Sequence, residues 1–338
     1  MILSLELTSS PLASELFPAE AWDSLFSSSQ STPETPFSTL EWQRLWWRHF
    51  GQEYRWSALT IRENERIIGI APFYWDRQTG FLKLMGGEDL SDYLDILAAK
   101  GRESQVWDQI LRYLEASPPQ IRGLDLHCLP STSPALQVLP PLAESRGYQV
   151  QCQAEEVCPI LELPQTWDAY LALLAGKERH ELRRKMRKAE LSSPPLLFRQ
   201  CAEEECARED IRSFICLHRK SQPEKQAFMD QQREAFFREV SDVFAKRGWL
   251  RLYILECGEK AVAAMLCFAY QEALYLYNSG FDPELSVLSP GIVLIGHCIQ
   301  DAIAQGKRRF DFLRGNEDYK YRLGGKDSPI FQMVVRRR

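Results

Sequence analysis

Apolar and polar residues alternate at two places in the chain in the pattern of paired β-strands joined by a short turn. The predicted pairs are 55–63 with 66–74, and 249–256 with 260–270. A third strand, at 273–279, follows the second pair. The pattern therefore predicts a small antiparallel sheet in each half of the chain.

Each strand pair is followed by a helix and then by another strand. Apolar residues three or four positions apart predict helices at about 103–116 and 290–305. The strands after them are predicted at 121–129 and 308–314, and each carries an arginine shortly before an aspartate. Because the same order occurs twice at a long period, we expect a duplicated domain rather than a solenoid.

The chain between the two halves is helical in pattern, over 166–190 and about 203–246. A length of 338 residues suits two domains of roughly 150 residues each. We place the boundary near residue 156, before the apolar run CPILEL at 158–163, which gives domains 1–156 and 157–338.

Composition narrows the class of protein. A hydrophobic fraction of 45% can fill two cores, and a net charge of −5 argues against a nucleic-acid binder over the whole chain, though not against a local basic patch. We expect no membrane span and no signal peptide, and hence a cytoplasmic protein. The nine cysteines show no CxxC pair and no Cys/His metal spacing, so we expect buried thiols in a reducing compartment and no metal.

The start of the helix predicted at 290–305 is one candidate binding site. Ser289 is a good N-cap residue, and Pro290 suits the first helical turn. A strand, a loop and a helix start leave backbone N–H groups and the positive end of the helix dipole facing outward, which suits a pyrophosphate. A well-capped helix without a ligand has the same local sequence, so both interpretations stay open.

The strand predicted at 308–314 and the segment after it are rich in polar groups. Asp311 alternates with two phenylalanines and therefore points to the opposite side of the strand. Arg314, Tyr319 and Lys320 follow it, at the end of a strand where open α/β sheets bind ligands. The alternative is a structural ion pair of Asp311 with Arg314 or Lys320.

A strongly basic helix is predicted at 177–188. Arg179, Arg183 and Arg187 lie along one edge of it, and like charges so spaced favour an anionic partner. A solvated surface helix is the alternative. His218 lies in another predicted helix, between apolar neighbours, where a structural histidine and a base are both possible.

Several segments resemble the GNAT-superfamily acetyltransferases of the BioF2-like or CelD-like type, which are related to the Fem-type aminoacyl ligases of cell-wall synthesis. In the C-terminal half they are LLAGKERHELRRKMRK, LHRKSQPEKQAFM, LYLYNSGFDPELSVLSPG and GKRRFDFLRGNEDYKYRLGG. In the N-terminal half they are PFSTLEWQRLWWRHFG, RIIGIAPFYW and LKLMGGEDLSDYLDIL, which look like the family's degenerate first repeat. FDFLRGNEDYKYR with SPG upstream is the most specific part.

The resemblance implies an α/β (α+β) fold of two tandem GNAT-like domains, each a twisted mixed sheet with helices on both faces. It implies an acyl donor, usually acetyl-CoA, between the strands at 273–279 and 308–313. The family's usual pyrophosphate loop, (Q/R)xxGxG/A, is missing, and residues 288–291 stand in its place. Fem-type relatives use aminoacyl-tRNA instead of acyl-CoA.

On this basis we expect a GNAT N-acyltransferase that acts on an amine of a small molecule or peptide. Asp311 is the expected base and Tyr319 the expected acid, since burial of a carboxylate raises its pKa and a phenol can protonate a thiolate. The expected cofactor contacts are Ser289, Gly291, Ile292 and Asn278. The expected substrate contacts are Arg183, His218, Arg314 and Lys320. A tRNA-dependent Fem-like transferase, with the basic helix on the RNA, and a non-catalytic binding protein are the alternatives.

Overall fold

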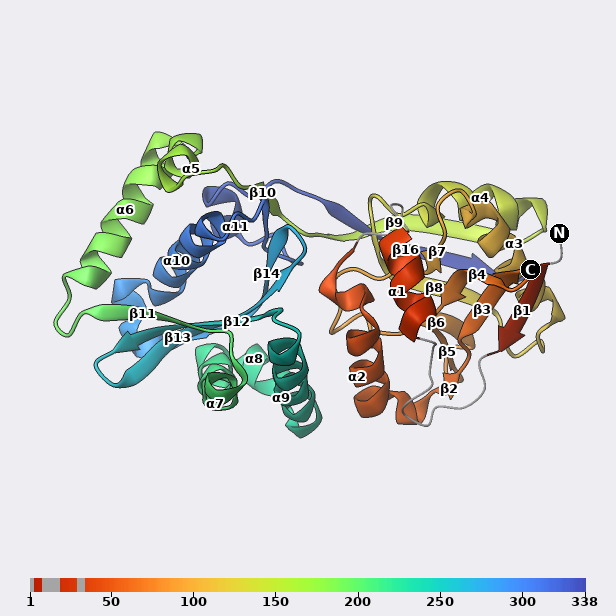
Figure 1. The fold of residues 1–338 in the computed structure, drawn as a ribbon, viewed down its shortest axis with the longest axis horizontal. Helices are drawn as coiled ribbons and strands as arrows, with labels where there is room; N and C mark the ends of the chain where they lie inside the picture. The colour runs from red at the N-terminus through yellow and green to blue at the C-terminus, as the bar shows by residue number, and fades with distance from the viewer. Residues whose placement is uncertain (1–2, 8–18, 29–33) are drawn as a thin grey trace. The chain divides into compact units, whose positions relative to one another are not determined.

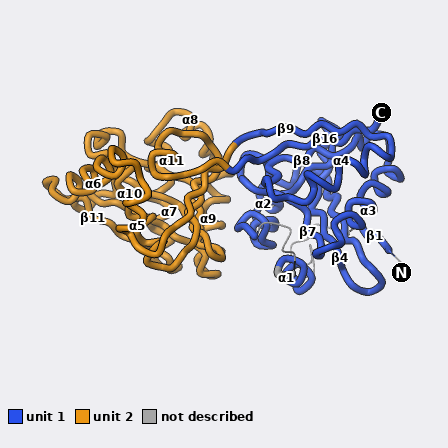
Figure 2. The backbone as a smooth tube through the Cα atoms, turned by 90° about the horizontal axis from the view of Figure 1, so that it is seen from above, with its two compact units in different colours: residues 1–156, 328–338 blue, residues 157–327 orange. Residues whose placement is uncertain are grey.

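The computed structural model describes residues 3–7, 19–28 and 34–338. The chain forms two compact units: unit 1 comprises residues 1–156 and 328–338, and unit 2 comprises residues 157–327 (Figure 2). The last segment differs from the predicted domain 157–338. It forms strand β16 (Pro329–Arg336), which pairs antiparallel with β8 (Gly123–Pro130) and so completes the sheet of unit 1.

Unit 1 contains two sheets. The four-stranded sheet has the order β1-β3-β4-β7 and the six-stranded sheet the order β2-β5-β6-β8-β16-β9. The other strands are β1 (Leu3–Leu7), β2 (Arg55–Trp56), β3 (Leu59–Glu63), β4 (Arg66–Ala71), β5 (Phe73–Asp76), β6 (Phe81–Leu84), β7 (Leu97–Ala98) and β9 (Gln149–Val157). The helices are α1 (Ala19–Ser28), η1 (Pro36–Ser38), α2 (Leu40–Phe50), η2 (Gly51–Glu53), α3 (Glu103–Ala116) and α4 (Ala135–Ser145).

The first predicted hairpin contributes strands to both sheets of unit 1. The run at 55–63 becomes β2 and β3, and the run at 66–74 becomes β4 and the start of β5. Pro72 interrupts the second run, where a residue without an N–H cannot continue the ladder. Helix α3 buries its apolar face as predicted, and Gly69 lets it approach β4, because a Cβ at Gly69 would lie 2.6 Å from Val106.

Unit 2 contains one six-stranded sheet with the order β10-β15-β14-β13-β12-β11. Its strands are β10 (Ile160–Glu162), β11 (Leu196–Cys201), β12 (Leu250–Cys257), β13 (Lys260–Tyr270), β14 (Ala273–Phe281) and β15 (Arg309–Asp311). Its helices are α5 (Trp167–Leu173), α6 (Gly176–Glu190), α7 (Glu204–Ser221), α8 (Pro223–Phe228), α9 (Gln231–Lys246), η3 (Pro283–Leu288), α10 (Pro290–Ala304) and α11 (Asp318–Arg322).

Helices cover both faces of the unit 2 sheet, with α6 and α10 on one side and α7 and α9 on the other (Figure 1). Leu182 and Met186 of α6 pack on α10, and Gly296 permits this contact because a Cβ there would lie 3.1 Å from the Met186 sulfur. On the other side, a Cβ at Gly280 would lie 2.2 Å from the backbone nitrogen of His218. Two glycines thus bring both helical layers close to the sheet.

The predicted helical stretches are interrupted more often than the apolar pattern suggests. The stretch at 166–190 is two helices, α5 and α6, and the stretch at 203–246 is three. Pro223 opens α8 because it has no N–H to donate into the preceding helix. Asp230 then starts α9, and its carboxylate accepts a hydrogen bond from the N–H of Arg233 at 2.7 Å.

The two units share a strand order. In each six-stranded sheet, three neighbouring antiparallel strands precede a helix, and the strand after that helix pairs parallel to the third: β2, β5, β6, α3 and β8 in unit 1, and β12, β13, β14, α10 and β15 in unit 2. In unit 1 alone, strands of the four-stranded sheet lie between these elements in the chain. A further strand then pairs antiparallel on the outer side, β16 on β8 and β10 on β15. The duplication predicted from the sequence pattern is therefore present in the topology.

The cysteines differ in part from the prediction of buried thiols. Cys201 and Cys206 form a disulfide across the turn from β11 into α7, with their Cα atoms 5.9 Å apart. Cys152 and Cys216 are exposed.

Of the helices within 19–28 and 34–338, none is long and apolar enough to cross a bilayer.

Candidate active site

Strands β14 and β15 separate in the middle of unit 2. They pair in parallel for three residue pairs, of which the last joins Tyr275 and Asp311. Beyond that pair β15 ends, whereas β14 continues to Phe281. The register of β14 against β13 also shifts around Tyr277, and a bulge of this kind bends a strand. The strands therefore part at Asp311, at the place where the resemblance puts the acyl donor.

Five polar residues from four segments gather beyond this point, and we call them the parted-strand site. They are His218 at the end of α7, Lys225 in α8, Asn278 and Ser279 in β14, and Glu317 just before α11. The Asn278 side chain is hydrogen-bonded to His218 and accepts the N–H of Ser279 at 2.9 Å. Asn278, predicted to contact the cofactor, thus fixes the course of β14 through its side chain.

His218 is a buried neutral imidazole. Its side chain is 1% exposed, and burial, together with the nearby charge of Lys225, lowers its pKa to about 4. Its Nδ1 atom has no hydrogen-bond partner within the part of the chain that the structure describes. The predicted contact of His218 with substrate would have to be made by an uncharged ring.

Lys225 is a functional candidate that the sequence did not single out. Its Nζ atom donates to the Ser279 carbonyl oxygen at 2.5 Å and lies 3.4 Å from the Ser279 hydroxyl. Burial lowers its pKa to about 8, although the charge of Glu317 acts in the opposite direction. An ammonium with this pKa can give up its proton near neutral pH, which is what an acid or base catalyst needs.

Lys320 holds together the loop that follows β15. It is 2% exposed, and its Nζ atom donates to the carbonyl oxygens of Leu313, Arg314 and Gly315 at 2.9, 2.7 and 3.1 Å. It also lies 3.0 Å from a carboxylate oxygen of Glu317. An ammonium has three N–H donors, so these oxygens occupy all of them. This arrangement differs from the predicted contact with substrate and gives Lys320, with the Arg314 backbone, a role in shaping the loop.

Asp311 is 4% exposed and stands at the last pair before the strands part. One carboxylate oxygen accepts the N–H of Leu313 at 2.8 Å, where the chain turns with a φ of 56°. The flanking phenylalanines belong to the hydrophobic core, as the alternation predicts. The carboxylate thus supports a strained turn at the point where the two strands part.

Tyr319 is half-buried and packs against Phe312, with their ring centroids 6.5 Å apart. Burial and, to a smaller extent, the charge of Glu317 raise the pKa of Tyr319 above the usual value of a phenol. A phenol with a raised pKa is a weaker acid, so this environment disfavours the predicted proton transfer to a thiolate.

Helix α10 begins at Pro290, one residue after Ser289, as predicted, but the cap differs. Ser289 adopts the left-handed conformation with a φ of 52°, and its side chain makes no capping hydrogen bond. Gly291 lies in the first turn in open space, because a Cβ there would meet only the Phe281 ring, at 3.9 Å. The N–H groups of Gly291 and Ile292 belong to the first helical turn, whose N–H groups have no partner inside a helix.

The basic face of α6 lies beside the segment that leads into α10. Lys188 donates to the carbonyl oxygen of Val287 in η3 at 3.0 Å. Arg183 and Arg187 are exposed and have no ion-pair partner among the described residues. With four neighbours they line a hollow of about 430 Å³; the full set is His180, Arg183, Arg184, Arg187, Lys188 and Leu191. The hollow is therefore a concave, strongly basic surface.

The corresponding parting in unit 1, between β6 and β8, is occupied by charged side chains. His127 of β8 lies 2.8 Å from Glu88, 3.2 Å from Asp125 and 2.6 Å from Glu155. Burial alone would lower the pKa of His127, but these three hydrogen-bonded carboxylates raise it to about 11. The carboxylate of Glu88 is therefore held by His127 in this part of unit 1.

Residues 176–321 match the model of the acetyltransferase (GNAT) domain family. This match spans the parted strands, the start of α10 and the basic helix.

The chain has a GNAT/Fem-like fold. It is similar to the crystal structure of FemX, with a TM-score of 0.65 at 9% identity, over 94% of this chain and 96% of that one. It is also similar to a tandem GNAT protein from the clavulanic acid biosynthesis pathway, with a TM-score of 0.56 at 11% identity, over 99% and 98%. The L-PGS structure from Bacillus licheniformis gives a TM-score of 0.55 at 10% identity, over 95% and 92%.

These similarities confirm the predicted fold class of two tandem GNAT-like domains. No curated protein matches the chain. At these identities the similar structures establish the fold, and the chemistry has to be argued from the residues of the site.

Proposed function

We propose that the protein is an N-acyltransferase that moves an acyl group from acyl-CoA, with acetyl-CoA as the typical donor, to an amine of a small molecule or peptide. The parting of β14 and β15 at Asp311 carries this proposal, because the two strands stop pairing there and the end of β14 lies beside the start of helix α10. The GNAT-domain match over residues 176–321 supports the same reaction type.

The start of α10 fits the pyrophosphate of such a donor. The N–H groups of Gly291 and Ile292 and the positive end of the helix dipole suit an anion, and Gly291 leaves space for it. The acidic side chains that precede the helix, Glu284 and Asp282, both pair with lysines. Lys220 lies 3.3 Å from Glu284 and 2.8 Å from Asp282, and Lys260 lies 2.8 Å from Asp282. The donor thioester would then lie along β14 toward Asp311, where backbone N–H groups of the strand can face the developing oxyanion.

The reaction needs a neutral amine. Its nitrogen attacks the acyl carbonyl carbon, the carbon–sulfur bond breaks, and the sulfur leaves as a thiolate that takes up a proton. Asp311 remains our proposed base for the amine proton, directly or through a water. Lys225, whose pKa is lowered to about 8 by burial, suits the return of a proton to the thiolate better than Tyr319 does.

Substitution of Gly291 tests the donor site. We expect Gly291→Asp to weaken binding of acetyl-CoA to the full chain at least about tenfold, because it places a carboxylate against the pyrophosphate, a loss of about 1.4 kcal/mol. The helix should form normally, since an acid in the first turn is favourable for the dipole. Titration calorimetry measures the effect. Gly291→Ala, which adds an uncharged methyl group at the same position, is the control for the charge and should weaken binding less than Gly291→Asp does.

Undiminished binding in Gly291→Asp would place the donor elsewhere. Unit 1 is the obvious alternative place. There, however, the charged cluster around His127 fills the corresponding parting. A fragment of residues 1–156 would be a poor test of unit 1, because it lacks β16 from the interior of the sheet.

The basic hollow on α6 favours a second candidate function, a Fem-like transfer from aminoacyl-tRNA. We expect instead that Arg183 and Arg187 serve a single small anion, because the net charge of −5 repels an extended polyanion outside the hollow. The double substitution of both arginines with Gln should weaken binding of donor or acceptor without lowering the melting temperature, since both side chains are exposed. Glu178→Gln on the same helix is the control.

Tight RNA binding by the native chain, with a steep salt dependence that the double substitution removes, would favour the tRNA-dependent reaction. A filter-binding assay at several salt concentrations distinguishes the two donors.

A further inference from the structure

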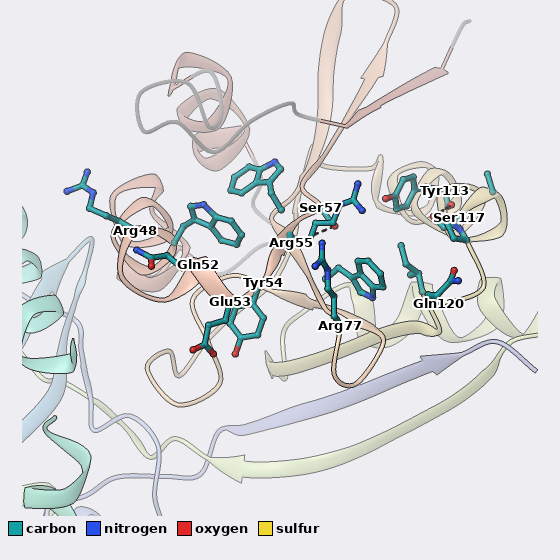
Figure 3. Close-up of a pocket in the computed structure, with 17 residues that line it drawn as sticks. Arg48, Gln52, Glu53, Tyr54, Arg55, Ser57, Arg77, Tyr113, Ser117 and Gln120 are labelled. Atoms are coloured by element: carbon teal, nitrogen blue, oxygen red, sulfur yellow. Dashed lines mark hydrogen bonds between the residues drawn. The ribbon is translucent and has the colours of Figure 1, made fainter. Parts of the chain in front are cut away.

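Unit 1 carries a separate open pocket of about 1230 Å³ at the edge of its six-stranded sheet (Figure 3). We call it the edge groove and define it by Trp47, Arg55, Trp56, Trp75, Arg77 and Tyr113. Its walls come from the end of α2 and η2, the edge strand β2, the end of β5, and the end of α3 with the loop after it. None of these residues belongs to the proposed transferase site in unit 2.

The groove is lined by several separate aromatic rings. Trp47 and Trp56 meet edge to face, with centroids 5.0 Å apart and ring planes at 79°, so they do not form a parallel slot for a flat base. Trp75 lies across the strand pair from Arg55, and directly opposed residues of a pair point to the same side. The indole of Trp75 therefore stands on the same face as an arginine.

Two arginines lie beside the indole of Trp75. The Arg77 guanidinium lies over the Trp75 ring, 5.7 Å from its centroid, and Arg55 is its cross-strand neighbour. Neither arginine has an ion-pair partner among residues 3–7, 19–28 and 34–338. Arg48 and Glu53 also line the groove, so its charge is positive overall. Two guanidinium groups beside one indole face are suited to a ring that carries an anionic group.

Neutral polar groups complete the lining. The amides of Gln52 and Gln120 are exposed and form no hydrogen bond within the described residues (Figure 3). The hydroxyls of Ser57 and Ser117 also line the groove, where they donate to the backbone carbonyl oxygens of Arg55 and Tyr113. Amides and hydroxyls are the natural partners of sugar hydroxyl groups, which both donate and accept hydrogen bonds. Apolar faces with a few convergent polar groups are the usual composition of a small-molecule site.

We propose that the edge groove binds an acidic oligosaccharide. Sugar rings pack on the partly exposed rings of Trp56, Trp75 and Tyr113. Their carboxylate, sulfate or phosphate groups meet Arg55 and Arg77. A nucleotide also combines rings with an anionic group. The perpendicular arrangement of Trp47 and Trp56, however, does not provide a stacking slot for its base. The proposal is independent of the donor site in unit 2.

Titration calorimetry with the full chain tests this proposal, using tetragalacturonate as the acidic probe, maltotetraose as the neutral probe and uridine monophosphate as the nucleotide probe. We expect tetragalacturonate to bind measurably and more tightly than maltotetraose. Combined Arg55→Gln and Arg77→Gln substitutions should weaken it at least about tenfold, since two charge-assisted contacts are lost. Trp75→Leu should weaken both saccharides.

Arg66→Gln is the matched control, because Arg66 is an exposed arginine on β4 of the same unit and does not line the groove. Absence of tetragalacturonate binding would overturn the proposal, as would equal losses in the control and the double variant. Equal affinity for maltotetraose would refute recognition of the charge. Tighter binding of uridine monophosphate that is lost in the double variant would make the groove a nucleotide site. The arginines are surface residues, so the variants should fold as the native chain does.

Discussion

Asp311→Asn should lower the rate of acyl transfer by roughly 100- to 10,000-fold while leaving the melting temperature nearly unchanged, because loss of a general base alone has an effect of this size. The asparagine side chain keeps its oxygen, so it can still accept the N–H of Leu313 and support the turn at the end of β15. What it loses is the ability to take the amine proton. The measurement compares rate and thermal unfolding in the same preparation.

Asp318→Asn is a suitable control, since Asp318 is an exposed carboxylate in the same segment and pairs only loosely with Arg322, at 3.4 Å. It should act as the native enzyme does. The opposite result for Asp311→Asn is a fall of about 3–5 kcal/mol in the free energy of unfolding, with activity falling only as far as the folded fraction of the protein falls. That is the expected effect of breaking a buried ion pair, and it would leave Asp311 as a structural residue.

Lys320→Met should destabilise the protein by about 3 kcal/mol or more. Methionine fills similar space but has no N–H donor, so three carbonyl oxygens in the loop after β15 lose a charged partner. Hydrogen bonds to charged groups contribute about 1.5–3 kcal/mol each, and the substitution removes three of them together. Chemical denaturation measures the change.

Lys326→Met is the control, because Lys326 is an exposed lysine a few residues further on. It should unfold at the same denaturant concentration as the native chain. If Lys320→Met unfolds like the native chain but raises the KM for donor or acceptor, Lys320 contacts substrate, as the sequence suggested, and does not hold the loop.

Local periodicity identified several main elements of both units. Helix α3 and helix α10 each bury an apolar stripe at helical spacing, and the strands at 249–256 and 260–270 pair as one hairpin. The alternation around Asp311 also predicted that the two flanking phenylalanines pack in the core, where the structure has them. These features depend on neighbours within a few positions of one another, so a single sequence records them.

Features that depend on distant segments could not be predicted in this way. Strand β16 belongs to unit 1 because it pairs with β8, about two hundred residues earlier, and no local pattern shows this partner. The charge of Lys320 is visible in the sequence, but the three backbone carbonyls that bind it are not. Lys225 became a candidate only because α8 packs it against β14, where burial lowers its pKa.

The donor is the central claim, and thermal unfolding of the native chain with acetyl-CoA, longer acyl-CoAs and RNA tests it most directly. A ligand that binds the folded state at a concentration one hundred times its Kd stabilises the protein by about 2.7 kcal/mol. We predict that at least one acyl-CoA raises the melting temperature and that RNA does not. A rise with RNA and none with any acyl-CoA would contradict the account and favour the tRNA-dependent transferase.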